Sequence, residues 1–586
     1  MRQWMVAAKK ADFYVIAEKF HVDPVVARII RNREVIGEKN IRIYLGGNLS
    51  DLSDPHQMKD MDRLVEILAQ KIRKQVHIRI IGDYDVDGVT SSHLFLTALR
   101  RVGAKVDVVI PHRIQDGYGL SLHLLQQAKE DGVDTILTCD NGIAAIDEIA
   151  WAKAQKMTVL VTDHHAVPFE EHEGRRTEKK SLADAVVNPH QQDCGYPYKE
   201  LCGAGVAWNV IRVLYENYDM DKREAEDLLD FVAMATVCDV MSLTGENRIL
   251  VKEGLKRIRH TKNIGLQALM QACNVQPENI SAYHFGYVLG PCVNATGRLD
   301  TARHALRLFE TGQETEAEEI ARDLVDLNQE RKELTLQGVE MAKKLCEEGG
   351  YENDPVLVLF LPDVHESIAG LIAGRIREMY NRPVFVLTRG EEGVKGSGRS
   401  TENYSMYENM CGCAELFTKF GGHPMAAGLS LPEENVEKFR RKINENCPLT
   451  VEEVCPDIHI DMAMPVGYAS TELVHQFALL EPFGKDNPSP LFADRNLSIS
   501  RMWLIGKNRN VLRMSVLSEY GQLVPVIFFG DVETLFAYFT EKFGQEEVEN
   551  ALHGRKNRIL FSMVYTAKID FYQGNENLQL EMKYYR

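Results

Sequence analysis

Acidic and histidine side chains recur in four short motifs of the sequence, and these residue types are the ones best suited to metal chemistry. The motifs are Asp83-Tyr-Asp85-Val-Asp87-Gly, Asp140-Asn-Gly, Asp163-His164-His165 and Val-Cys-Asp239. Carboxylate oxygens with one or two imidazoles suit Mn²⁺ or Mg²⁺, and the histidines favour Mn²⁺. Two such ions, about 3.5–4 Å apart, clamp a phosphodiester and generate a hydroxide nucleophile near neutral pH.

A simpler explanation exists for any one of these acids. An aspartate at the end of a strand often only caps the helix that follows. For Asp83 alone, a cap or turn explains the residue as well as a ligand role does. Four separate motifs, two of them with paired ligand types, favour a metal centre over four independent caps.

The elements that must position these motifs are short, β-branched apolar runs that alternate with helical patterns. This alternation predicts an α/β fold with a mainly parallel sheet and helices on both faces. Three motifs end predicted strands, and Asp239 ends an apolar helical stretch. The carboxyl ends of parallel strands face one crevice, so the motifs are expected to meet there. The predicted strands lie at residues 77–81, 105–110, 135–138, 158–161 and 183–187.

The remaining chain predicts further domains. The first fifty residues have helical spacing, and residues 312–348 form one long helical pattern of the kind that bridges two domains. A second α/β pattern follows, and the last 130 residues alternate like the strands of a small barrel of OB type. The predicted segments are an N-terminal helical part at 1–60, a catalytic domain at 61–305, a connecting helix at 306–350, a second domain at 351–450 and the barrel at 451–586.

Composition limits the classes of protein. The 586 residues are 45% apolar, which is ordinary for globular domains. Neither a transmembrane run nor a secretory signal is expected, and eleven cysteines without a C-x-x-C pair indicate reduced thiols in the cytoplasm. The net charge of −17 alone argues against nucleic acid, but basic residues outnumber acidic ones in 1–113, so a local groove can still be positive.

Taken together, the four motifs resemble those of the DHH phosphoesterase family. Residues 421–428 (GGHPMAAG) resemble the glycine-rich motif of the companion domain, called DHHA1, and 481–488 (EPFGKDNP) resemble the entry to a C-terminal OB domain. The order of domains resembles the family members that digest single-stranded DNA from the 5′ end in recombination and repair. The resemblance implies two metal ions held by Asp85, Asp87, Asp140, His164 and Asp239, with Asp163 and His165 also in the catalytic set.

Two positions depart from the family pattern. Ile81 stands where many members have a histidine, and Asp486 stands where a glycine is usual. The first removes one ligand from a metal, and the second affects only a turn. The acidic helical piece at 539–554 has no role that the sequence assigns.

A 5′-end nuclease needs a pocket for a terminal phosphate, and arginine holds phosphate bidentately. Three arginines lie in predicted turns or strand ends, although a lone arginine is more often a solvated surface group. The resemblance places the 5′-phosphate near Arg113, Ser397 and Arg399, with Arg298 beside the strand. His423 lies between two glycines and a proline, and it either contacts the scissile phosphate or a base or has a structural role. Tyr118 either stacks on a base or is partly buried against the protein.

The resemblance also implies partners: single-stranded DNA, single-strand binding protein and a RecQ-type helicase, with a monomeric chain and no membrane. Two other functions remain open. One is a phosphodiesterase for small oligonucleotides, against which the OB segment argues. The other is a catalytically silent DNA-binding scaffold, against which the intact acidic motifs argue.

Overall fold

The structure, a computed structural model, folds into two compact units. The first unit contains residues 48–456, and the second contains residues 3–47 together with 457–586. The described residues are 3–113, 116, 119–172, 175–299, 301–390, 393–506, 510–519, 521–572 and 574–586.

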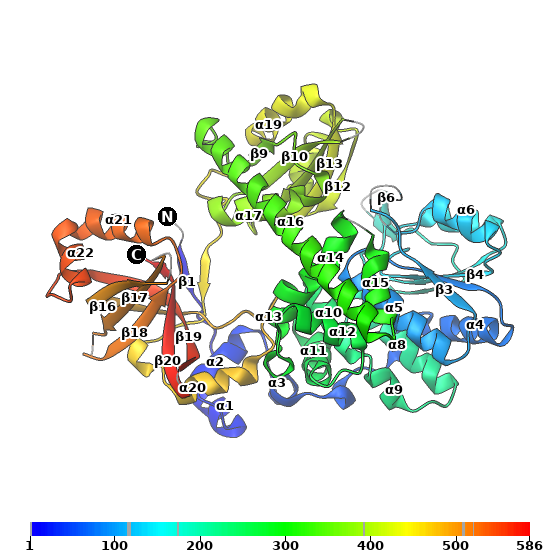
Figure 1. Cartoon of the computed structure of the whole chain (residues 1–586), viewed down its shortest axis with the longest axis horizontal. Coiled ribbons are helices and arrows are strands. Elements are labelled where there is room, and N and C mark those ends of the chain that lie inside the picture. The colour runs from blue at the N-terminus through cyan, green and yellow to red at the C-terminus, as the bar shows by residue number, and fades with distance from the viewer. Residues whose placement is uncertain are drawn as a thin grey trace. The chain divides into compact units, whose positions relative to one another are not determined.

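A five-stranded parallel sheet forms the core of the first domain of this unit, which confirms the prediction; β3 and β4 are labelled in Figure 1. Its order is β3-β2-β4-β5-β8, and the strands are β2 (Ile78–Ile81), β3 (Val106–Val109), β4 (Thr135–Cys139), β5 (Thr158–Thr162) and β8 (Ala185–Val187). Alternate side chains along each strand enter two separate cores, because successive residues point to opposite faces. One core holds α6 (Leu122–Glu130) and α7 (Ile146–Ala154), and the other holds α4 (Met61–Arg73), α5 (Val86–Arg101) and α8 (Gly203–Asn217).

A helical layer extends the second of these cores. Within it α10, α14 and α15 pack on α5, α10 also packs on α8, and the layer leads into α16, whose 35 residues confirm the predicted long helix. At 1.5 Å per residue α16 is about 50 Å long. It contacts helices of the first domain and α17 of the next (Figure 1). The helices are α10 (Leu229–Cys238), α11 (Gly245–Ile258), α12 (Ile264–Ala272), α13 (Ala282–His284), α14 (Gly290–Leu299), α15 (Ala302–Glu310), α16 (Glu314–Glu348) and α17 (Glu366–Tyr380).

A second sheet, in the order β12-β13-β11-β10-β9, completes the first unit. Only β9 and β10 are parallel. α17 packs on one face of the sheet and α19 (Val436–Glu445) on the other. The strands are β9 (Leu357–Phe360), β10 (Val384–Gly390), β11 (Gly393–Arg399), β12 (Lys419–His423) and β13 (Ala426–Leu431).

The glycine- and serine-rich run that ends at Arg399 is not the turn that the sequence suggested. It is β11, a central strand that pairs with β10 on one side and β13 on the other. Glycine fits here because neighbouring side chains occupy the space: a Cβ on Gly398 would lie 2.4 Å from Sδ of Met406. Arg298 likewise lies inside α14, and not in a turn or strand end.

The second unit contains the OB-type barrel that the sequence predicts. β16 pairs with both β17 and β19, and β20 joins β18 to β19, so the sheet closes. The strands are β15 (Met462–Ala463), β16 (Phe492–Ile505), β17 (Val511–Leu517), β18 (Leu523–Phe528), β19 (Leu560–Tyr572) and β20 (Asn575–Tyr585).

The N-terminal helices belong to this second unit. β1 (Trp4–Val6) pairs in parallel with β14 (Ile458–Ile460), and the next three helices share the core of the barrel. The predicted segment 1–60 is therefore divided between the two units. The acidic segment near 539–554 is structural in part, since Phe539, Val548 and Ala551 are buried in that core. The helices are α1 (Phe13–Phe20), α2 (Pro24–Asn32), α3 (Glu38–Gly46), α20 (Thr471–Phe477), α21 (Val532–Phe543) and α22 (Gln545–Leu552).

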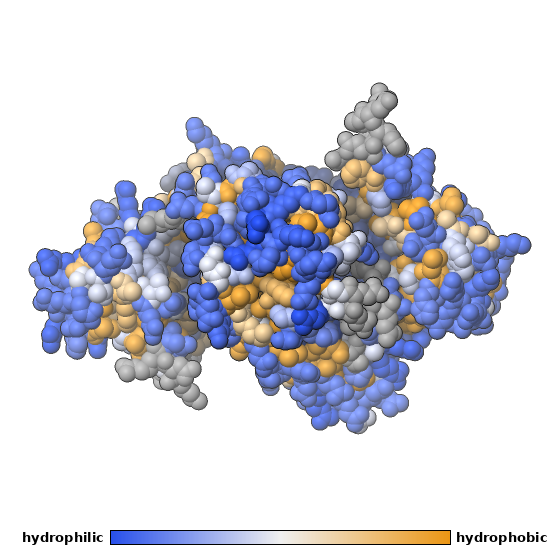
Figure 2. All heavy atoms as spheres, turned by 90° about the horizontal axis from the view of Figure 1, so that it is seen from above, coloured by the Kyte–Doolittle hydropathy of each residue, from blue (hydrophilic) through white to orange (hydrophobic). Residues whose placement is uncertain are grey.

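Hydrophilic residues cover most of the surface that Figure 2 shows, with hydrophobic residues between them. Among the described helices, none has the length and apolar character needed to cross a bilayer. The eleven cysteines are all free thiols.

Candidate functional site

The carboxyl edge of the first sheet gathers the acidic and histidine motifs. Asp140 follows β4, the Asp-His-His motif follows β5, and Asp239 caps the C-terminal end of α10. The three aspartates at 83, 85 and 87 lie where β2 passes into α5. Three groups of side chains each have possible ligand atoms within 4.8 Å of one another: Asp140, His164 and His165; Asp87, His164 and Asp239; and Asp83, Asp85 and Asp140.

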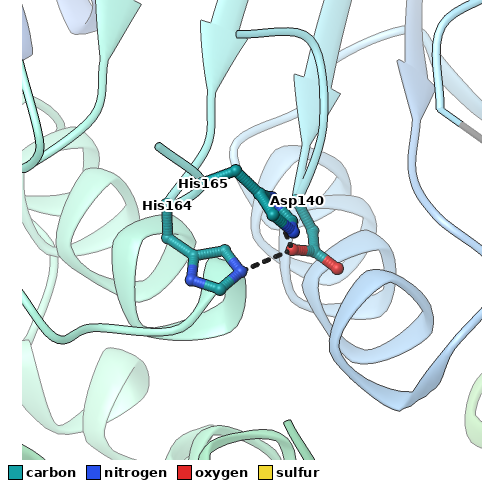
Figure 3. A group of neighbouring side chains, drawn as sticks. All are labelled: Asp140, His164 and His165. Atoms are coloured by element: carbon teal, nitrogen blue, oxygen red, sulfur yellow. Dashed lines mark ion pairs between the residues drawn. The ribbon is translucent and has the colours of Figure 1, made fainter. Parts of the chain in front are cut away.

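His164 belongs to two of these groups, and Figure 3 shows its ring directed at the carboxylate of Asp140. Its Nε2 lies 3.1 Å from Oδ1 of Asp140, 3.6 Å from Oδ2 of Asp239 and 3.7 Å from Oδ2 of Asp87. Burial lowers the pKa of His164, with the charge of Asp87 acting in the opposite direction. Because a ligand imidazole must be neutral, this environment suits a metal ligand.

Helix α8 fixes one carboxylate of the cluster. Its first backbone N–H groups, from Gly203 and Ala204, donate to Oδ2 and Oδ1 of Asp87 at 2.6 and 2.7 Å. The positive end of the helix dipole stabilises this anion. Glycine is needed here, because a Cβ on Gly203 would lie 2.6 Å from Cβ of Asp140.

Asp140 has a left-handed backbone, with φ of 62°. Such values are uncommon outside glycine and concentrate at functional sites. Asn141, the next residue, donates from Nδ2 to the carbonyl oxygens of Ile81 and Cys139 at 3.0 and 2.9 Å. The ends of β2 and β4 are thereby held together beneath the carboxylates.

The carboxylate of Asp163 bonds to neighbouring residues and belongs to none of the three ligand groups. Its carboxylate accepts hydrogen bonds from the backbone N–H groups of Ile143, His164 and His165. Nδ1 of His165 also lies 2.8 Å from Oδ1 of Asp163. Burial lowers the pKa of His165, but this hydrogen bond and the charge of Asp163 outweigh burial and raise it to about 9. Asp163 therefore orients the two histidines.

The carboxylates repel one another. Burial, and then the charge of Asp87, raises the pKa of both Asp85 and Asp140, the latter well above its usual range. Burial, and then the charge of Asp85, likewise raises the pKa of Asp83. Several buried carboxylates with an imidazole form a donor set that a divalent cation neutralises. The residues present therefore fit Mn²⁺ or Mg²⁺.

For Asp83 the sequence leaves a helix cap or turn and a ligand role equally open. The cap of α5 is Asp85, whose Oδ1 accepts from Gly88 N–H at 3.0 Å. Asp83 is instead buried within the cluster, and its Oδ1 has no hydrogen-bond partner among the described residues. Ile81, in contrast, is buried in the apolar core and supplies no ligand atom.

A pocket of about 540 Å³ lies between the two domains of the first unit. Tyr84 and Arg113 line it from the first domain, and Ser367, Lys395, Ser397 and Lys419 from the second. Of these, only Arg113 and Ser397 were predicted. The lining tyrosine and lysines match no phosphate-binding motif, so the sequence offers no reason to select them. The guanidinium of Arg113 lies 5.0 Å from the ring centroid of Tyr84.

Positive charge accumulates beside this pocket. Burial, and then the charge of Arg113, lowers the pKa of Arg298 to about 10 and also lowers the pKa of Arg399. Nη1 of Arg298 donates to the carbonyl oxygen of Ser367 at 2.6 Å, which joins the two domains. Nη1 of Arg399 donates to the carbonyl oxygen of Gly398 at 2.7 Å. Buried arginines whose charge is disfavoured by burial and by Arg113, as at Arg298 and Arg399, suit an anionic ligand.

Arg298 and Arg399 do not line the pocket themselves but contact Ser367 and Ser397, which do. Two further predicted residues are not brought to the pocket. His423 is exposed at the end of β12 and is not among the lining residues. Tyr118 lies outside the described residues.

Comparisons with known proteins cover nearly the whole chain. Three family profiles match: the DHH family, N-terminal domain, at residues 77–236; the DHHA1 domain at 353–447; and the RecJ OB domain at 460–584. The single-stranded-DNA-specific exonuclease RecJ of Haemophilus influenzae is 32% identical over 582 residues, which cover 96% of each chain. RecJ of Bacillus subtilis is 33% identical over 88% of this chain, which spans 64% of that protein's length.

A solved structure agrees with these sequences. RecJ from Thermus thermophilus in complex with Mn²⁺ matches with a TM-score of 0.79 and 25% identity, over 100% of this chain and 79% of that one. Domain order, profiles and full-length identity lead to the same conclusion: the chain belongs to the RecJ family of DHH phosphoesterases.

Proposed function

We propose that this chain is a metal-dependent exonuclease that hydrolyses single-stranded DNA from its 5′ end. The observation that carries the proposal is the cluster of aspartates around His164, next to a pocket that Arg113 lines and that Arg298 and Arg399 flank through contacts with Ser367 and Ser397. Membership in the RecJ family supports single-stranded DNA as the substrate.

In this proposal Asp85, Asp87, Asp140, His164 and Asp239 hold two Mn²⁺ or Mg²⁺ ions, and Asp83 joins them. The ions supply Lewis acidity and lower the pKa of water at the phosphate. The chain holds the ligands in place before substrate binds: α8 fixes Asp87, and Asp163 fixes the histidines. His165, the more exposed histidine, would either complete a metal site with Asp140 and His164 or donate a hydrogen bond to a phosphate oxygen.

Polarity follows, in this proposal, from the pocket. Arg113, Ser397 and Arg399 bind the terminal 5′-phosphate, and Arg298 binds the strand near the junction of the domains. His423 is proposed to contact the strand at the edge of the second sheet. These contacts reach only the backbone, so no sequence preference is expected.

The direct test is digestion of 5′-phosphorylated DNA, single-stranded and duplex, with Mn²⁺, with Mg²⁺ and with EDTA. We expect mononucleotides to be released from the 5′ end of single strands only, and EDTA to stop the reaction. Release of label from the 3′ end first, or equal digestion of duplex, would refute the proposal. Tight binding of single strands without any hydrolysis would favour the scaffold function instead.

The barrel is proposed to provide a second binding site for single-stranded DNA. A piece containing residues 48–456, which form one compact unit, is expected to hydrolyse short oligonucleotides. Its affinity for long single strands should fall, because base stacking is worth about 1–3 kcal/mol per base. Fluorescence anisotropy with a labelled 40-mer measures the change. Equal affinity of the piece and the full chain would give the barrel another role.

The family resemblance further supports single-strand binding protein and a RecQ-type helicase as partners, and a monomer in the cytoplasm as the working form. Co-sedimentation of the purified proteins tests the two partners. Sedimentation equilibrium of the chain alone tests the monomer.

A further inference from the structure

Two tyrosines on the segment that packs against the end of α10 are exposed although they stack on each other. Tyr283 lies in α13, and Tyr287 lies in the π-helix Phe285–Leu289 that follows it. Their ring centroids are 5.0 Å apart with 23° between the planes, and the residues are 62% and 71% exposed. A large side chain that stays in water carries little folding energy, so these rings leave a flat aromatic surface without a packing role.

The position of the pair relates it to the candidate metal site. The π-helix packs against the C-terminal end of α10, where Cys238 Sγ lies 3.3 Å from the carbonyl oxygen of Phe285. A Cβ on Gly286 would meet Val237 at 3.5 Å. The residue after Cys238 is Asp239, which belongs to the cluster around His164. The neighbouring labels α10 and α13 can be followed in Figure 1.

The same helical segment also reaches the phosphate pocket. It runs without a break from Ala282 through the π-helix to Leu299, and Arg298 near its far end bonds to Ser367. Eleven residues separate Tyr287 from Arg298, which is about 16 Å at 1.5 Å per residue. The tyrosines therefore lie at the end of the segment that is remote from the pocket for the terminal phosphate. π-helical turns are rare and are often found at functional sites.

We propose that Tyr283 and Tyr287 are a stacking platform for bases of the single-stranded DNA substrate, on the 3′ side of the scissile phosphate. The inference rests on the proposed exonuclease function. Every base has a π-face, so a pair of exposed rings binds single strands without reading sequence. Bases in a duplex are already stacked and paired, so the platform also favours single strands over duplex.

The test replaces both rings: the double variant Tyr283→Ala/Tyr287→Ala is compared with Tyr283→Phe/Tyr287→Phe, which keeps the rings. The Ala variant is expected to raise KM for a 5′-phosphorylated 20-mer by about tenfold or more, with kcat unchanged. The Phe variant should retain the KM of the wild type. Leu336→Ala, on α16 and also 62% exposed, controls for loss of an exposed apolar side chain.

A second measurement locates the bases. One nucleotide at a time in the 20-mer is replaced by an abasic residue. The wild type should show a raised KM at one or two positions beyond the 5′-terminal nucleotide, and the Ala variant should show no further rise there. If the wild type digests the 20-mer but the Ala variant has the same KM, the platform is wrong and the exonuclease function stands. If the wild type digests no DNA, the proposed function itself fails.

Discussion

Asp140→Asn is expected to lower the rate of DNA hydrolysis in Mn²⁺ by about two to three orders of magnitude, the scale of losing electrostatic stabilisation at the reacting phosphate. Oδ1 of Asp140 lies 3.1 Å from His164, so the substitution removes a charge at the centre of the cluster. Asparagine tolerates the left-handed backbone at this position, so the fold should persist. Single-turnover kinetics with labelled single strands measure the loss.

The same variant should be more stable than the wild type when metal is removed. The folded-state pKa of Asp140 is raised, so its contribution to stability is present below the unfolded pKa and is lost as pH rises through the folded pKa. At neutral pH in EDTA, burial and repulsion of the Asp140 carboxylate therefore lower the free energy of unfolding of the wild type, and Asp140→Asn removes this effect. Thermal unfolding in EDTA should show a higher Tm for Asp140→Asn, and Mn²⁺ should raise the Tm of the wild type more than that of the variant.

Asp219→Asn is the matched control, because Asp219 also has a positive φ, of 51°, but is exposed. It should change neither rate nor the response of Tm to Mn²⁺. Near-normal hydrolysis by Asp140→Asn at saturating Mn²⁺ would contradict the metal assignment. A lower Tm of Asp140→Asn in EDTA would contradict the argument from repulsion.

The cluster could be predicted because a geometric rule connects sequence to space. Parallel strands carry their carboxyl ends to one edge, so Asp140 and His164, which follow two different strands, had to come close. This rule predicts that the motifs lie close together, but it does not predict which carboxylate oxygen caps a helix and which one binds a metal. It could not tell that Asp85 both caps α5 and belongs to the cluster, while Asp83 belongs to the cluster without capping the helix, since both lie in the same turn.

Features set by distant parts of the chain could not be predicted. The run that ends at Arg399 has turn-forming residues, and it is a strand only because β10 and β13 supply hydrogen bonds on both sides. β1 pairs with β14, more than four hundred residues away, and no local pattern signals such a partner. The exposure of rings such as Tyr287 could not be predicted either, because hydrophobic periodicity indicates only which residues are buried.

Arg399→Ala is expected to remove most of the preference for 5′-phosphorylated over 5′-hydroxyl ends, by about 10- to 100-fold, the value of hydrogen bonds to a charged group. The side chain of Arg399 lies beside Ser397, and its Nη1 is oriented by the carbonyl oxygen of Gly398. Burial, and then the charge of Arg113, lowers the pKa of Arg399. A bound phosphate would offset this repulsion between the two arginines. The ratio of kcat/KM for the two kinds of end, measured for each variant, gives the effect.

Arg399→Lys separates charge from geometry. Lysine keeps the charge but lacks the planar fork that binds a phosphate at two oxygens, so its preference should fall between those of the wild type and of Arg399→Ala. Arg389→Ala is the control, since Arg389 lies in the same sheet but is paired with Glu433 at the surface. Neither substitution at 399 should alter the rise in Tm with Mn²⁺, because the arginine does not belong to the carboxylate cluster. If Arg399→Ala keeps the full preference for phosphate, the terminal phosphate binds elsewhere, and the polarity of the enzyme needs another cause.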